Sequence, residues 1–165
     1  MVVRKAIPED GAKLAELIKH VEATSGFMMF GAGERKMTSG QGEEMVGRFA
    51  ADETSALFVA EKADELIGYL IAVGGGAPRK RHCAYLVAGI AEFHRGTGVG
   101  TKLFESLEDW APKAGIHRLE LTVMAHNKAA IALYEKMGFS IEGTKHHSLK
   151  IDGRYVDEYY MFKLI

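Results

Sequence analysis

The sequence has almost no cysteine and no long apolar run, and each shortage excludes a class of protein. Cys83 is the only cysteine among 165 residues, so no internal disulfide can form and a reducing cytoplasm is the expected setting. No apolar stretch reaches membrane-spanning length and the N-terminus has no signal-peptide layout, so we expect no membrane partner. Cys83 itself falls in an expected strand, where a buried thiol is far commoner than a nucleophile.

The chain also lacks an excess of charge of either sign. Lysine and arginine number 21, aspartate and glutamate number 22, and the net charge is −1. This balance argues against a nucleic-acid partner bound over a broad surface, although it allows a local basic pocket. Nearly half of the residues are apolar, as in globular chains, and at this length we expect a single domain over residues 1–165.

What the chain does have is a regular alternation of strand and helix patterns. The predicted strands cover residues 2–7, 55–62, 66–73, 84–90, 118–125, 139–143, 144–151 and 155–165. The predicted helices begin at Pro8, Glu43, Thr101 and near Asn127, and a right-handed β-α-β crossover joins the strands 84–90 and 118–125. We therefore predict an α/β fold with a mixed twisted sheet of about six to seven strands and about four helices on its two faces.

A glycine-rich loop follows the predicted strand 84–90 and leads into a helix. Its sequence is His-Arg-Gly-Thr-Gly-Val-Gly over residues 94–100. Glycine reaches backbone angles closed to other residues, and the first N–H groups of a helix have no intrahelical partner, so such a loop can bind a phosphate. Arg95 adds a permanent positive charge. A tight structural turn uses the same residues, so both interpretations stay open at this point.

Two familiar phosphate loops do not fit these residues. The Walker pattern ends in Gly-Lys-Ser/Thr, whereas this chain has Gly100-Thr101-Lys102. The dinucleotide fingerprint needs a third glycine where Thr101 stands, and it lies near the start of a βαβ unit. A phosphate ligand of this loop would therefore belong to another kind of molecule.

A second group of residues lies on the helix that begins near residue 127. Asn127, Ala130 and Tyr134 are spaced to share one face of that helix. The helix follows the strand parallel to the one before the glycine loop, so its first turn should lie beside the loop, where α/β proteins place ligands. The face offers an amide, a small residue and a phenol. Asn127 equally fits a helix cap, and Tyr134 equally fits a half-buried core position.

Residues 95–100 match the pattern Arg/Gln-x-x-Gly-x-Gly/Ala, and residues 127–139 match Asn-x-x-Ala-x-x-Leu-Tyr-x-x-x-Gly-Phe. In this order and spacing, the two motifs resemble those of the GNAT superfamily of acetyl-CoA-dependent N-acetyltransferases. The C-terminal run with Asp152 and Asp157 resembles the branch that includes bacterial amino-acid, polyamine and ribosomal-protein N-acetyltransferases. Glu92 stands where many members have proline, which we expect to alter the strand end and not the loop.

This resemblance implies an acyl-CoA N-acyltransferase-like fold whose sheet splays at the central strands. The loop would hold the coenzyme A diphosphate, the strand end would pair with the pantetheine amides, and Tyr134 would be the catalytic residue at the sulfur, as general acid or as oxyanion-side donor. Gly89 is expected to form a bulge that opens the slot. The implied acetyl-CoA-binding residues come from the strand end and the two motifs: Ala88, Gly89, Ile90, Arg95, Gly96, Thr97, Gly98, Val99, Gly100, Thr101, Asn127 and Ala130.

The implied reaction is direct attack of a primary amine on the acetyl thioester in a ternary complex, with no protein nucleophile and no metal. A base or a water chain must take the proton of the amine. The candidate bases are Glu120, Glu92, His126 and the pair His146-His147, and the sequence does not favour any of them.

The acceptor that we expect first is an amino acid or another small amine. A protein N-terminus, a polyamine, and a module that binds acetyl-CoA without turnover remain alternatives. The acceptor site would depend on the hairpin 146–150 and on the segment 27–37, which is either a lid or a loop packed on the core. A homodimer through a sheet edge or the C-terminal strands is also compatible with the sequence.

Overall fold

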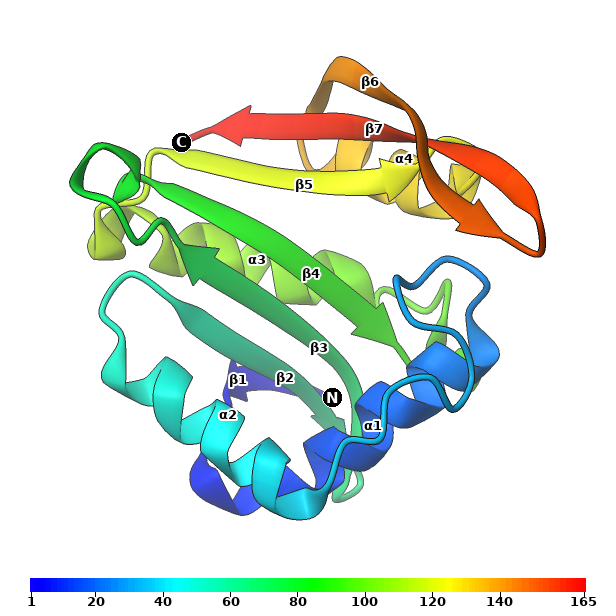
Figure 1. The fold of residues 1–165 in the computed structure, drawn as a ribbon. Coiled ribbons are helices and arrows are strands. Elements are labelled where there is room, and N and C mark those ends of the chain that lie inside the picture. Colours follow the sequence, from blue (N-terminus) through cyan, green and yellow to red (C-terminus); the bar gives the residue numbers. More distant parts are fainter.

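The computed structural model describes residues 1–165, and its strands form one seven-stranded sheet (Figure 1). Their order across the sheet is β1-β2-β3-β4-β5-β7-β6, and β4–β5 is the only parallel pair. The predicted mixed sheet is therefore confirmed. The strands are β1 (Val2–Lys5), β2 (Ala56–Lys62), β3 (Glu65–Gly74), β4 (Cys83–Ile90), β5 (Arg118–Met124), β6 (Ser140–Ile151) and β7 (Arg154–Leu164).

Four α-helices cover the two faces of the sheet, as predicted (Figure 1). One face carries α1 (Gly11–Thr24) and α2 (Ser39–Ala51), and the other carries α3 (Val99–Trp110) and α4 (Lys128–Lys136). None of these helices has the length and apolar character that crossing a lipid bilayer requires. Short 3₁₀ turns occupy Pro8–Asp10, Pro78–Lys80, Glu92–His94 and Pro112–Ala114.

Each face of the sheet has its own buried cluster, because successive side chains of a strand point to opposite faces. On β2, Leu57 and Val59 belong to the cluster under α1 and α2, whereas Phe58 and Ala60 belong to the cluster under α3. The sheet thus separates two cores, and a ligand that enters between its strands can contact both sides.

The sheet opens between β4 and β5, and we call this opening the split. Pairing between the two strands stops at Tyr85, which lies opposite Glu120. From there β4 runs on to Ile90 beside β3 alone, and β5 runs on to Met124 beside β7 alone. The two strands diverge visibly in Figure 1, so the predicted splay at the central strands is confirmed.

Gly89 does not form the bulge that the sequence suggests. β3 and β4 keep a regular register through the pair Tyr69–Gly89. A Cβ on Gly89 would lie 2.5 Å from the ring of Tyr69, which is 1% exposed. Glycine is needed here because Tyr69 fills the space, and the split arises on the other side of β4, where β5 turns away.

Two helices begin earlier than predicted, and the start of α2 has a local cause. α2 begins at Ser39 and not at Glu43, because Thr38 and Gln41 form a reciprocal capping box with distances of 3.2 and 2.9 Å. α3 begins at Val99 and not at Thr101. The strand predicted as two pieces, 139–143 and 144–151, is one strand, β6, whose pairing with β7 is irregular in two places.

Candidate functional site

The glycine loop leads from the open edge of β4 into α3. Gly96 and Gly98 have φ angles of 74° and 88°, in the left-handed region that favours glycine. The hydroxyl of Thr97 donates to the carbonyl of His94 at 2.7 Å. Both glycines therefore carry backbone angles that let the chain turn sharply just before the helix begins.

The N–H groups of this loop have no partners within the chain. Those from Gly96 to Gly98 donate no hydrogen bond to any other atom of the protein. Those from Val99 to Thr101 lie in the first turn of α3, where a helix offers no acceptor. A continuous run of free N–H donors at a helix N-terminus is the arrangement that binds phosphate groups.

The Arg95 side chain is engaged with the chain itself. Its guanidinium donates to the carbonyl and the hydroxyl of Thr24 at 3.1 and 2.9 Å and to the carbonyl of Ile90 at 3.1 Å. These hydrogen bonds tie the loop to the end of α1 and to the end of β4. The charge of Arg95 stays beside the loop, while its donors hold the loop in place.

Gly100 allows α4 to pack closely against the first turn of α3. A Cβ on Gly100 would lie 2.7 Å from Leu133 of α4. Lys136 adds a hydrogen bond to the hydroxyl of Thr101 at 3.2 Å. The two sequence motifs therefore meet in space, through the middle and the C-terminal end of α4.

Asn127 caps α4, which is one of the two roles that its position suggests. Its Oδ1 accepts a hydrogen bond from the N–H of Ala130 at 3.2 Å. Ala130 is half-buried and packs on the cluster under α3. The cap uses the oxygen of the Asn127 amide, so its nitrogen remains a donor for a ligand.

Tyr134 combines a core ring with a free hydroxyl. The ring is half-buried, and its centroid lies 5.6 Å from that of Phe104 and 6.1 Å from that of Phe139. Burial, and to a smaller extent the neighbouring phenol of Tyr85, raises the pKa of Tyr134 to about 12. The phenol therefore stays protonated at neutral pH and can donate a hydrogen bond.

Two hydroxyls bridge the closed end of the split. The Tyr85 hydroxyl on β4 and the Thr122 Oγ1 on β5 lie 2.7 Å apart. Tyr85 is 37% exposed and is close enough to Tyr134 to affect its pKa. No sequence pattern predicted this pair, because an isolated strand does not show which side chains will face a gap in the sheet.

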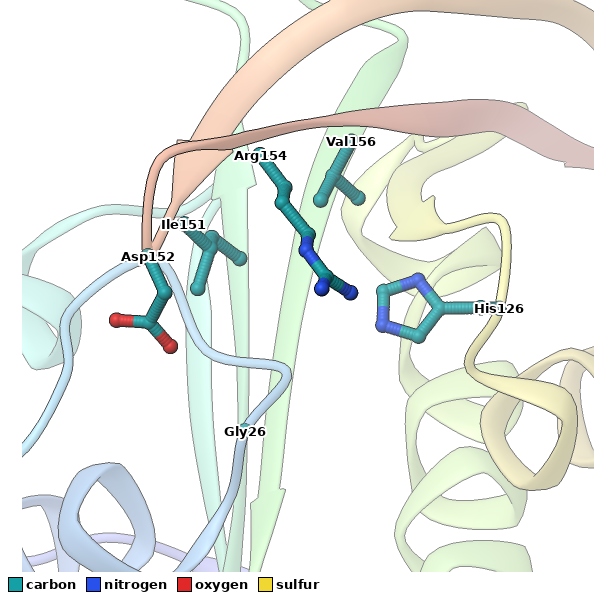
Figure 2. Close-up of a pocket in the computed structure, with 6 residues that line it drawn as sticks. All are labelled: Gly26, His126, Ile151, Asp152, Arg154 and Val156. Atoms are coloured by element: carbon teal, nitrogen blue, oxygen red, sulfur yellow. The ribbon is translucent and has the colours of Figure 1, made fainter.

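On the face with α1 and α2, three segments enclose a hollow of about 390 Å³ (Figure 2). The segments are the loop after α1, the turn between β5 and α4, and the β6–β7 hairpin. A second hollow, of about 370 Å³, shares His126 and Val156 with the first. The first hollow is lined by Gly26, His126, Ile151, Asp152, Arg154 and Val156.

The structure separates the predicted histidine bases. His126 lines both hollows, and its ring centroid lies 5.1 Å from that of Phe27. His147 lines the second hollow and stacks on Tyr155 at 5.1 Å. The His146 side chain is 80% exposed and lines neither hollow.

The predicted carboxylate bases are less suited to the role. Glu120 accepts from Arg118 at 2.9 Å and from Lys80 at 3.4 Å. Burial opposes ionisation of Glu120, but these two cations together hold its pKa below the usual value, which weakens it as a base. Glu92 is exposed in the turn after β4. Cys83 is a buried free thiol, as predicted.

The segment 27–37 is partly core and partly exposed. Met37 is 8% exposed and belongs to the cluster under α1 and α2, whereas Met29 is 74% exposed. Arg35 anchors the segment to α1 through an ion pair with the buried Glu22. Phe27 remains 40% exposed at the hollow, so this loop has an anchored end and an open end.

Comparison with known sequences identifies relatives of the chain. The family model described as "Acetyltransferase (GNAT) family" matches residues 28–139. The L-amino acid N-acetyltransferase AaaT of Escherichia coli (strain K12) is 34% identical over 105 residues, which cover 61% of this chain and 62% of AaaT. The chain spans less than two thirds of the length of most of the curated relatives that it matches, AaaT among them.

Solved structures match nearly the whole chain. The acetyltransferase of the GNAT family from Streptococcus pneumoniae is 30% identical with a TM-score of 0.95, and the match covers 99% of this chain and 98% of that one. The structure of yncA from Salmonella typhimurium, which contains its cofactor acetyl-CoA, is 21% identical with a TM-score of 0.89 and coverage of 99% and 93%. The second match concerns the fold alone.

Proposed function

This chain belongs to the GNAT family of acetyltransferases, and from that premise we propose that it moves the acetyl group of acetyl-CoA to the primary amine of a small molecule. The observation that carries the proposal is the run of free N–H groups from Gly96 to Thr101 beside the open edge of β4. An amino acid is the first choice of acceptor, because AaaT is named for that activity.

The glycine loop would hold the diphosphate of the coenzyme. Its free N–H groups supply the donors, and the positive end of the α3 dipole favours the negative charge. Arg95 contributes by fixing the loop against Thr24 and Ile90. Asn127 offers an amide nitrogen to the pantetheine arm, and Ala130 offers room beside it.

The pantetheine arm would lie along β4 in the split. Beyond Tyr85, β4 pairs with β3 alone, so main-chain groups of Ala88 and Gly89 on the other edge are free to pair with amides, while the carbonyl of Ile90 already accepts from Arg95. An extended ligand can join such an edge as a further strand does. The two cores on either side of the sheet would then surround the thioester.

The reaction would be a direct transfer. The neutral amine attacks the thioester carbonyl, a C–N bond forms, the C–S bond breaks, and the proton of the amine ends on the coenzyme thiol. Tyr134 would donate a hydrogen bond to the developing thiolate, because its phenol is protonated and free. His126 is the base in this proposal, which its position in the lining of both hollows supports.

Tyr134→Phe tests this mechanism. We expect kcat to fall about 100-fold, in the range that general acids contribute, with the Kd for acetyl-CoA unchanged. Release of free coenzyme thiol measures turnover, and calorimetry measures binding. Tyr160→Phe, at an exposed position of β7, is the matched control and should keep full activity. Full turnover in Tyr134→Phe would refute the role of Tyr134.

The same two assays separate the alternatives. A non-catalytic acetyl-CoA sensor would bind the coenzyme and release no thiol with any amine. An N-terminal or polyamine acetyltransferase would release thiol with peptides or spermidine and not with amino acids. If calorimetry detects no binding of acetyl-CoA to this protein, the proposal is refuted as a whole.

The proposal includes where the protein works and whether it forms a dimer. The protein would work in the cytoplasm, where its single thiol, Cys83, stays reduced. A homodimer would form through the outer strands β6 and β7, which expose Ile141 and Tyr160. Sedimentation velocity decides between monomer and dimer.

A further inference from the structure

Arg154 is a cation without an anionic partner at the hollow of Figure 2. It forms none of the ion pairs of the structure and no side-chain hydrogen bond. Arg154 is exposed, as are the equally unpaired Arg48, Arg79 and Arg81, but of these four it alone lines the hollow. The half-buried arginines of the chain are each paired with carboxylates. Those pairs are Arg4 with Asp10 and Glu61, Arg35 with Glu22, and Arg118 with Glu120 and Glu142.

The hairpin turn directs Arg154 into the hollow and leaves Asp152 apart from it. Asp152 and Gly153 have φ angles of 49° and 77°, as a tight two-residue hairpin turn requires. Figure 2 shows the Arg154 side chain extending toward His126, with the Asp152 carboxylate directed elsewhere. Asp152 is the only carboxylate that lines this hollow, and it does not pair with Arg154.

The surroundings suit a small anionic ligand. A guanidinium presents a planar set of donors that matches a carboxylate with two parallel hydrogen bonds. Ile151 and Val156 provide apolar walls, which strengthen an ion pair by reducing its exposure to water. The volume of about 390 Å³ lies within the range of small-molecule sites.

We infer that Arg154 binds the carboxylate of the acceptor, so that the enzyme selects small amino acids over amines that carry no carboxylate. This inference rests on the proposed function, because it names the acceptor of that reaction. His126 lies beside Arg154 in the hollow and directly precedes Asn127, the cap of α4, so an amine held with its carboxylate on Arg154 would face the turn that leads to α4.

The test compares acceptors that differ only in the carboxylate. The probes are the proteinogenic L-amino acids and their α-carboxamides, used as matched pairs with the full-length protein and acetyl-CoA. In the wild type, kcat/KM for the best acid should exceed that for its carboxamide by about 10- to 100-fold, the usual effect of a hydrogen-bonded charge pair. Arg154→Ala should remove this preference through the KM of the acid, and leave the KM of the carboxamide unchanged.

Two further variants sharpen the comparison. Arg154→Lys keeps the charge and loses the two-pronged geometry, so its preference for the acid should be intermediate. Arg79→Ala removes an exposed arginine in the turn between β3 and β4, away from the hollow, and should keep the wild-type preference.

The outcomes distinguish this inference from the proposed function. If Arg154→Ala weakens acid and carboxamide alike, or if the wild type has no preference, Arg154 does not recognise a carboxylate. If spermidine or a peptide is acetylated and no amino acid is, the inference is refuted while the acetyltransferase function stands. If acetyl-CoA binds but no amine is acetylated, the proposed function fails and the inference fails with it.

Discussion

The proposed coenzyme side and the proposed acceptor side of the split are built in different ways. The coenzyme side consists of the glycine loop and α4, which are two short stretches of sequence. The acceptor side brings together Gly26, His126 and the hairpin residues 151–156, which lie far apart in the chain. A site made of contiguous residues takes its geometry from local backbone rules, whereas a site made of distant residues exists only once the sheet has formed.

Burial differs between the two sides as well. Beneath the loop, Val99 and Leu103 are 1% and 0% exposed, so the coenzyme side is continuous with the core. On the acceptor side, Phe27 and Tyr155 are 40% and 60% exposed. We therefore expect substitutions around the loop and β4 to affect stability and coenzyme affinity. Substitutions of Arg154 at the hollow should affect the choice of acceptor and leave stability and coenzyme affinity unchanged.

The largest expected effect is on stability, from Gly89→Ala. Its new Cβ would lie 2.5 Å from the Tyr69 ring, and overpacking of a tight core costs about 1–3 kcal/mol. Urea denaturation measures the loss of unfolding free energy. The double variant Gly89→Ala with Tyr69→Leu should recover part of it, because the smaller side chain gives room. A Gly89→Ala protein as stable as the wild type would contradict the packing role of Gly89.

Gly98→Val should weaken the coenzyme side and leave the acceptor side intact. A β-branched residue at a φ of 88° costs about 1–2 kcal/mol, so the Kd for acetyl-CoA should rise about tenfold. Gly76→Val is the matched control, since Gly76 has no positive φ and nothing near its Cβ position. Equal effects of both variants on acetyl-CoA binding would contradict the role of the positive φ of Gly98 on the coenzyme side.

The smallest expected effect concerns the pH dependence of kcat, in which titration of Tyr134 should produce no falling limb near pH 10. Burial raises the pKa of Tyr134 to about 12, so its proton is retained from neutral pH to about pH 10, where an ordinary tyrosine begins to titrate. A falling limb near pH 10 that disappears in Tyr134→Phe would contradict this.

The raised pKa of Tyr134 also determines the direction in which the free energy of unfolding changes with pH. Because the folded pKa of Tyr134 lies above the unfolded one, its contribution is complete below about pH 10 and is lost as the pH rises toward about 12. Asp157, on the acceptor side, behaves in the opposite way. The backbone N–H of His147 lowers its pKa, so that contribution is lost as the pH falls through the folded value.

The sequence correctly predicted features that depend on the local backbone and on neighbouring residues. The strand–loop–helix unit and the Asn127 cap follow from glycine and cap patterns, and the split was expected from the family resemblance. The structure confirms each of them. The prediction that Gly89 forms a bulge was wrong. Only the register against β3 shows that Tyr69 occupies the space where a Cβ of residue 89 would lie.

The residues that escaped prediction share one property. Tyr85, Thr122 and Arg154 lie in ordinary strands and carry no motif. Their importance comes from what faces them. Tyr85 and Thr122 face the gap between β4 and β5, and Arg154 faces a hollow whose one carboxylate, Asp152, does not pair with it. Neither the gap nor the hollow is a property of any single segment.

The amino-acid sequence alone determined the mixed α/β sheet and the glycine loop before α3, because these depend on periodicity and on backbone angles over a few neighbouring residues. The family followed from the resemblance of its two motifs to those of known acetyltransferases. Only the tertiary structure decided that Arg95 braces the loop, that Tyr134 keeps a free hydroxyl, and that Arg154 stands unpaired beside His126. The physical reason is that partners and exposure depend on contacts between segments that the sheet brings together from distant parts of the chain.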